Sequence, residues 1–135
     1  MTYPISALDG IDAGTVARLK AAGIRTTERL LEAAKDAKGR KALEEQIGVD
    51  AKRLLCWANM ADRMRIKGMG RDYAELLRQA GVDTVRELKH RNAARLARAI
   101  AAANQKRRRV RLPPSEKAVT RWIDQAKKLP LKISY

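Results

Sequence analysis

Apolar residues recur at helical spacing along most of the chain. Between residues 50 and 65 the apolar positions lie three or four residues apart and share one face of an α-helix, as do Leu54, Trp57, Ala61 and Met64. Long stretches of alternating apolar and polar residues, which are typical of half-buried strands, do not occur. The pattern therefore predicts an all-α fold.

The same periodicity divides the chain into eight short helices. We expect them at residues 13–22, 27–35, 39–47, 50–65, 71–80, 84–91, 92–103 and 115–128. Gly23 and Gly81 stand where a helix commonly ends in a left-handed residue. Thr84 and Glu87 form a capping box, whose side chains bond the free N–H groups at a helix start.

An internal repeat relates the two halves of the chain. Residues 8–12 align with residues 66–70 at an offset of 58, and the glycines after the following helix keep this register. Farther along, the offset grows to 65, and there Trp57 aligns with Trp122. The change of offset implies an insertion of seven residues in the second copy.

The repeat defines the expected organisation of the chain. We expect two tandem repeats, residues 1–65 and 66–135, packed as one compact helical domain. The insertion falls within residues 104–114, which form the most basic stretch of the sequence. The second repeat is therefore the more specialised of the two.

The second repeat contains the most specific motif of the chain. It runs from Ile66 to Leu77 as Ile-Lys-Gly-Met-Gly-Arg-Asp-Tyr-Ala-Glu-Leu-Leu, and it resembles a helix-hairpin-helix, whose pattern is apolar-x-Gly-apolar-Gly followed by alanine and leucine. Glycines let the backbone turn tightly and approach a phosphate, and the N–H groups at the next helix start attract an anion. We expect phosphate contacts from Gly68, Met69, Gly70 and Arg71. The alternative is that the glycines only permit close helix packing.

The first repeat departs from this motif. Gly10 is present, but Asp12 takes the place of Gly70, and Val16 takes the place of Ala74. A carboxylate would repel a phosphate, so we expect Gly10 to serve only the turn. Binding should therefore be concentrated in the second repeat.

Positive charge is also concentrated in the second repeat. The chain holds 30 Lys and Arg and 15 Asp and Glu, a net charge of +15, of which residues 66–135 contribute +12. A field of this sign attracts polyanions such as nucleic acids. We expect contacts to extend over the insertion and the helix before it, through Arg95, Arg98, Lys106, Arg107, Arg108, Arg109 and Arg111. The alternative is a solvated loop, and folding is not expected to need the charge of the insertion.

The sequence offers little for catalysis or metal binding. It has one histidine, His90, and one cysteine, Cys56, so neither a thiolate metal site nor a catalytic triad can be assembled. We expect no enzyme activity and no cofactor. Trp57 and Trp122 have apolar neighbours, which favours core packing over stacking on bases. The absence of a long apolar run and of a secretory signal pattern predicts a cytoplasmic protein without membrane association.

Residues 5–129 as a whole resemble a widespread bacterial family of unknown function that has two helix-hairpin-helix units. The likeness lies in short segments spread over the chain, namely Gly39-Arg40, residues 57–62, Arg65-Ile66, Tyr73-Ala74 and residues 80–84. More distantly, the arrangement is similar to the tandem hairpin domains of UvrC and RuvA. That resemblance implies contact with the backbone of duplex DNA without reading of the sequence.

Together these features predict a sequence-independent binding protein for duplex DNA, as an accessory module of a DNA-processing or nucleoid complex. Two alternatives stay open: a module that docks an acidic protein partner, and a factor associated with RNA or the ribosome. The intact Gly68 and Gly70 favour DNA, whereas Asp12 in the first repeat favours a protein partner.

Overall fold

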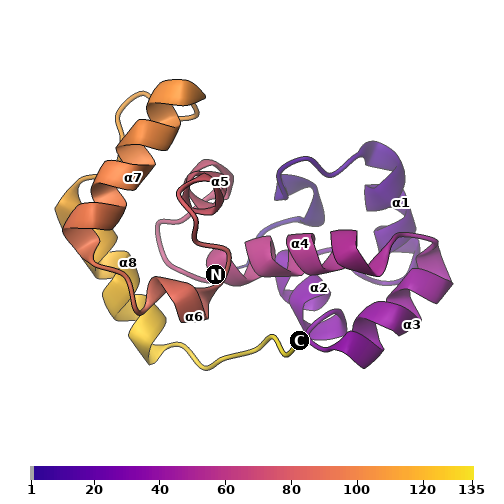
Figure 1. The fold of residues 1–135 in the computed structure, drawn as a ribbon. Coiled ribbons are helices and arrows are strands. Elements are labelled where there is room, and N and C mark those ends of the chain that lie inside the picture. The colour runs from indigo at the N-terminus through magenta and orange to yellow at the C-terminus, as the bar shows by residue number, and fades with distance from the viewer. Residues whose placement is uncertain (1) are drawn as a thin grey trace.

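The computed structural model describes residues 2–135, which form eight α-helices and one short 3₁₀ helix (Figure 1). In the first half, η1 (Ile5–Ala7) precedes α1 (Ala13–Ala21), α2 (Thr27–Ala33), α3 (Ala37–Ile47) and α4 (Ala51–Arg63). The second half contains α5 (Arg71–Gln79), α6 (Val85–Leu88), α7 (Ala93–Lys106) and α8 (Glu116–Lys128). Extended pairing in this part of the chain is limited to one bridge between Pro4 and Thr26, so the all-α prediction is confirmed. None of these helices is both long and apolar enough to cross a membrane.

Every predicted helix is present, with its ends displaced by at most three residues. The largest differences flank α7. The predicted helix 84–91 is a single turn that ends at Leu88, because the chain must leave the helix before Asn92, whose side chain caps α7. α7 in turn continues to Lys106, three residues beyond its predicted end.

The offsets of the internal repeat reappear in the helix bounds. α1 and α5 begin and end 58 residues apart, and α4 and α8 begin and end 65 residues apart. Both α1 and α5 end in a Schellman motif, in which the N–H of Ile24 donates to Leu19 and that of Val82 donates to Leu77, each at 2.8 Å. The glycines within these motifs have φ values of 83° and 94°, so their predicted left-handed conformation is confirmed.

α4 and α8 each pack against two other helices of their own half (Figure 1). α2 and α3 pack on α4, whereas α6 and α7 pack on α8, and α5 packs on α7. Trp57 on α4 and Trp122 on α8 are buried among these contacts, with 7% and 4% of their surface exposed. The prediction that both tryptophans belong to the core is therefore confirmed.

Arg63, the last residue of α4, joins the two halves. Its side chain is 1% exposed, and it donates from Nε to the carbonyl of Ala74 at 3.0 Å and from Nη1 to the carbonyl of Asp83 at 2.6 Å. Burial lowers the pKa of Arg63 to about 10, so the guanidinium is still protonated at neutral pH and makes both bonds. The end of α4 is thereby fixed to α5 and to the loop that follows it.

The C-terminal segment makes a second link between the halves. It leaves α8 and returns to the first half beside α2 and α3 (Figure 1). The N–H of Ser134 donates to the carbonyl of Lys35 at 2.7 Å, and the buried Arg40 donates to the carbonyl of Ser134 at 3.0 Å. The hydroxyl of Tyr135 donates to the side chain of Asn59 on α4 at 2.9 Å. Both ends of the second half are therefore anchored on the first.

Candidate nucleic-acid interface

The candidate interface is built on a turn that leads into α5. The N–H of Met69 donates to the carbonyl of Ile66 at 3.1 Å, and Gly68 within the turn has a φ of 80°. A residue with a side chain would be strained there, so the turn itself requires glycine at this position. The first half contains the equivalent turn, with a φ of 76° at Gly10.

One position on the last helix of each half holds the turn in place. Gln125 on α8 accepts from the N–H of Lys67 at 2.9 Å and donates to its carbonyl at 3.4 Å. In the first half, the N–H of Asp9 donates to the sulfur of Met60 on α4 at 3.1 Å. Asp9 and Lys67 correspond at the offset of 58, and Met60 and Gln125 correspond at the offset of 65. The same contact therefore occurs in both halves. Sequence reasoning missed it, although the alignment of the repeats pairs these positions.

Gly70, the residue before α5, is not explained by the fold. Its φ of −88° and ψ of −172° are extended values open to any residue, and a Cβ atom would meet nothing within 4 Å. Each of the other seven α-helices in residues 2–135 begins with a side-chain cap, which α5 lacks. The N–H groups of Arg71, Asp72 and Tyr73 have no hydrogen-bond partner in the described part of the chain. These donors are free to bind an acceptor from outside the molecule.

The start of α1 is instead occupied by a carboxylate of the chain itself. Asp12, the counterpart of Gly70, accepts from the N–H of Thr15 at 3.2 Å and from the hydroxyl of the same residue. The hydroxyl bond is the main cause that lowers the pKa of Asp12, so this group is charged at neutral pH. A phosphate at α1 would meet a negative charge and a donor that is already used. The two helix starts therefore differ at the position where the sequences of the repeats differ.

The insertion between α7 and α8 is folded against the end of α7. The side-chain oxygen of the buried Asn104 accepts from the N–H groups of Arg109 at 2.8 Å and Val110 at 3.1 Å. Its amide nitrogen donates to the carbonyl of Val110 at 3.1 Å. Asn104 thus fixes the backbone of the insertion at the residue that carries the Arg109 side chain.

Arg109 does not present a free charge. Its guanidinium contacts both carboxylate oxygens of Asp9 at 2.9 Å and one oxygen of Asp72 at 3.3 Å. The bond to Asp9 is the main cause that raises the pKa of Arg109, so the cation persists at neutral pH. The ion pairs bring the insertion beside the start of α5, where the single cation of Arg109 is shared between Asp9 and Asp72. From the sequence, Arg109 is expected to contact nucleic acid, and folding is not expected to need its charge. In the structure this charge is instead paired within the chain.

The other predicted contact residues are mostly exposed. Exposed side chains lie at the start of α5, along α7 and in the insertion, and they belong to Arg71, Arg95, Arg98, Lys106, Arg107, Arg108 and Arg111. Met69 is the exception, because its side chain is fully buried and its carbonyl accepts from the hydroxyl of Tyr3 at 3.3 Å. No group of three or more His, Cys, Asp or Glu side chains within residues 2–135 is placed to hold a metal ion.

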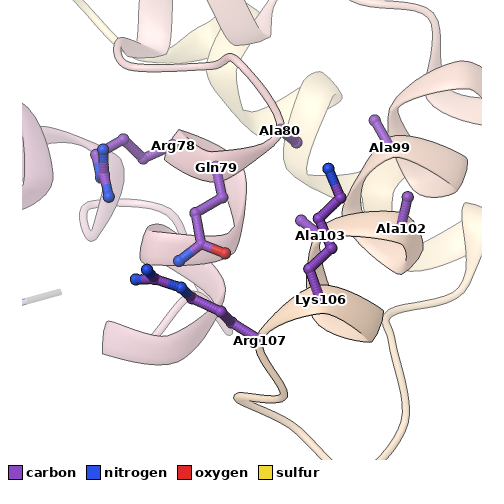
Figure 2. A pocket seen from close by; sticks show the side chains of 8 residues that line it. All are labelled: Arg78, Gln79, Ala80, Ala99, Ala102, Ala103, Lys106 and Arg107. Atoms are coloured by element: carbon purple, nitrogen blue, oxygen red, sulfur yellow. The ribbon is translucent and has the colours of Figure 1, made fainter.

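A groove of about 460 Å³ lies between the end of α5 and the end of α7. It is lined by Arg78, Gln79, Ala80, Ala99, Ala102, Ala103, Lys106 and Arg107. In Figure 2 the side chains of Gln79 and Arg107 extend toward each other, beside a wall of alanines from α7. Sequence reasoning did not single out Arg78, which pairs with the buried carboxylate of Glu75. The groove therefore combines cations with a small apolar wall.

Arg109→Ser is expected to lower the free energy of unfolding by about 1 kcal/mol, because it breaks a partly buried pair with two carboxylates. Arg108→Ser removes the same charge from an exposed neighbour and should change stability by less than about 0.5 kcal/mol. Urea denaturation of the two variants measures the difference. Equal stabilities would show that the ion pairs of Arg109 contribute nothing to the fold.

A family model described as a domain of unknown function (DUF4332) matches residues 9–129 of the chain. The matched region runs from the first turn to the residue after α8. No curated protein and no solved structure matches the chain significantly. The match thus covers nearly the whole chain and brings no activity, ligand or partner with it.

Proposed function

The chain belongs to the DUF4332 family of unknown function, and we propose that it binds the phosphate backbone of duplex DNA without reading the base sequence. The proposal rests chiefly on Gly70, which neither the backbone nor the packing requires and which leaves the first N–H groups of α5 open. Such a helix start favours an anion through its N–H groups and its dipole. Without a side chain at residue 70, a phosphate can approach closely.

We interpret residues 66–79 as a helix-hairpin-helix unit that binds phosphate. Residues 8–21 are then a second unit that keeps the turn and has lost the phosphate position to Asp12. Gly68 is required by the turn in this interpretation, whereas Gly70 is required by the ligand. Arg71, exposed in the first turn of α5, adds a positive charge at the same place.

The exposed cations of the insertion support contact with several phosphates. Because Arg109 pairs with Asp72, the backbone that carries Arg107, Arg108 and Arg111 is held near the start of α5. Backbone contacts of this kind supply affinity without sequence information. The burial of both tryptophans favours the backbone over stacked bases as the target. A role as an accessory module of a DNA-processing or nucleoid complex fits such a surface.

Binding to duplex DNA is expected to be moderate in strength and strongly dependent on salt. If about four to six phosphates are engaged, log K against log salt should have a slope near −4 to −5. Fluorescence anisotropy with a labelled duplex over a range of salt concentrations measures this slope. The proposal fails if no binding occurs at about 50 mM salt, or if the affinity does not change with salt.

The double change Arg107→Ser and Arg108→Ser should make the salt slope shallower by about two units, one for each lost phosphate contact. The matched control is Lys38→Ser with Lys41→Ser, which removes two exposed charges from α3 in the first half. The control should keep the slope of the unmodified protein. If both double variants behave alike, net charge alone governs binding and the insertion is not a contact surface.

An acidic protein partner is the second candidate, and the groove between α5 and α7 favours it. Alanines form one wall of that groove, and an apolar wall suits protein side chains better than phosphates. If duplex DNA does not bind, while an acidic protein is released by the change at Arg107 and Arg108, this candidate takes precedence. Equal competition by duplex RNA would instead extend the proposed function to RNA.

A further inference from the structure

We infer that a pocket between the turn at residues 66–69 and α8 binds a phosphate group. This site is separate from the free N–H groups at the start of α5. The identity of the ligand as part of a nucleic acid rests on the proposed function. The pocket has a volume of about 600 Å³, and Lys67, Gly68, Ser115, Ala118, Arg121 and Gln125 are among its lining residues. A volume of this order is typical of sites for small ligands.

The backbone on both sides of the pocket is fixed. Ala118, Arg121 and Gln125 recur every three or four residues and lie on one face of α8, and Ser115, which caps the helix, continues this spacing. Gln125 bonds both the N–H and the carbonyl of Lys67, which holds the turn against this face. The exposed side chains of Lys67 and Arg121 therefore start from two anchored positions on the same pocket.

Each of these positions is more positive in the second half than in the first. Lys67 corresponds to Asp9, Ser115 corresponds to Asp50, and Arg121 corresponds to the neutral Cys56. The first half thus has two carboxylates where the second half has two cations and a hydroxyl. These positions therefore favour an anion in the second half, whereas in the first half Asp9 is already paired with Arg109.

The corresponding surface in the first half carries a longer side chain, that of Arg53. Arg53, the counterpart of Ala118, lies over the ring of Trp57 at 4.8 Å from its centroid and 3.7 Å from a carboxylate oxygen of Asp12. In the second half, Trp122 is covered by Tyr73, with ring centroids 5.2 Å apart. Ala118 is too short to reach across the pocket, so the space beside the turn stays open to a ligand.

A phosphate group fits the chemistry of this pocket. The oxygen of Ser115 accepts from the N–H of Ala118 at 3.1 Å, so its hydrogen can be donated to a ligand. Lys67 and Arg121 supply two positive charges, and Arg121 can bond two phosphate oxygens at once. A Cβ atom at Gly68 would meet nothing within 4 Å, so the backbone is open to close approach. Three acidic residues, Asp72, Glu116 and Asp124, each stand next to a lining residue along the chain, and none of them lines the pocket.

The double change Lys67→Ser and Arg121→Ser should weaken duplex binding about tenfold and make the salt slope shallower by about two units. The matched control is Lys127→Ser with Lys128→Ser, which removes two exposed charges from the same helix outside the pocket. The control should retain the affinity and slope of the unmodified protein. If both variants lose affinity equally, the pocket is not a phosphate site.

A second experiment tests the pocket without DNA. Inorganic phosphate added to the full chain should shift the NMR signals of the Lys67 and Gly68 amides. Ala118→Arg, which introduces the residue type of its counterpart Arg53, should cover the pocket and abolish those shifts although it adds positive charge. The inference is overturned if the shifts are absent, or if they persist in Ala118→Arg.

The source of the phosphate is identified by comparing duplexes with and without 5′-phosphate ends. Tighter binding of the phosphorylated duplex, lost in Ala118→Arg, assigns the pocket to a strand terminus. Equal binding of both duplexes, weakened alike by Ala118→Arg, assigns it to an internal phosphodiester. If phosphate shifts the amides but no duplex binds, the pocket stands and the proposed function fails. If duplexes bind and the pocket variants have no effect, the proposed function stands and the pocket fails.

Discussion

Arg63→Ala is expected to lower the free energy of unfolding by about 3 kcal/mol, because it removes two hydrogen bonds from a charged donor and leaves a cavity. The side chain is 1% exposed and bonds the carbonyls of Ala74 and Asp83, which lie in the other half of the molecule. Alanine would leave the Asp83 carbonyl without this donor and would separate the end of α4 from α5. Urea denaturation followed by circular dichroism measures the loss.

Lys128→Ala is the matched control for this prediction. Lys128 is the counterpart of Arg63 at the offset of 65, and it is exposed at the end of α8. Its replacement should change the free energy of unfolding by less than about 0.5 kcal/mol. Equal effects of the two substitutions would show that Arg63 does not hold the halves together.

The helices could be predicted from the sequence because local signals determine where they begin and end. The caps at Asp12 and Thr84 and the glycines at positions 23 and 81 each act within one turn of their helix. α6 shows the limit of such signals. The sequence predicts a helix that reaches residue 91, but the cap of the next helix at Asn92 leaves room for one turn only.

The contacts between the halves could not be predicted in this way. Arg109 and Asp9 are 100 residues apart in the sequence. Arg63 bonds main-chain carbonyls, which every residue has, so no residue type marks its partners. Helical periodicity tells which face of a helix is apolar and does not tell which distant element covers it. The return of the C-terminal segment to Lys35 depends on such a pairing as well.

The candidate site was predicted in part. The motif placed Gly68 and Gly70 together and gave both the same purpose, whereas the φ angles separate them. Gly68 is required by the turn, and Gly70 is free of any requirement from the fold. The charge pattern indicated the insertion as a basic surface but could not distinguish the paired Arg109 from its exposed neighbours. That distinction depends on which carboxylates the folded chain brings near.

Gly70→Asp is expected to weaken duplex binding by about 2 kcal/mol, roughly thirtyfold, while it leaves the fold intact. The substitution reproduces Asp12, which bonds the N–H of Thr15 at the start of α1. The new carboxylate should bond the N–H of Tyr73 in the same way, so a phosphate would lose a donor and meet a negative charge. The Cβ atom has room, and an aspartate cap should raise stability by about a few tenths of a kcal/mol. Binding and stability are therefore expected to change in opposite directions, which unfolding alone cannot produce.

Two further substitutions separate the phosphate site from net charge. Ala13→Glu places a carboxylate in the first turn of α1, where the exposed Ala13 is the counterpart of Arg71, and it should change the affinity less than Gly70→Asp does. Asp12→Gly frees the start of α1 and should strengthen binding by about 1 kcal/mol, the contribution of one charged contact. Anisotropy titrations at one salt concentration, with circular dichroism to verify helicity, compare all three variants. Only a local phosphate site at the start of α5 makes the two positions unequal. Equal losses of affinity in Gly70→Asp and Ala13→Glu would therefore mean that the start of α5 contributes no more to binding than other parts of the surface.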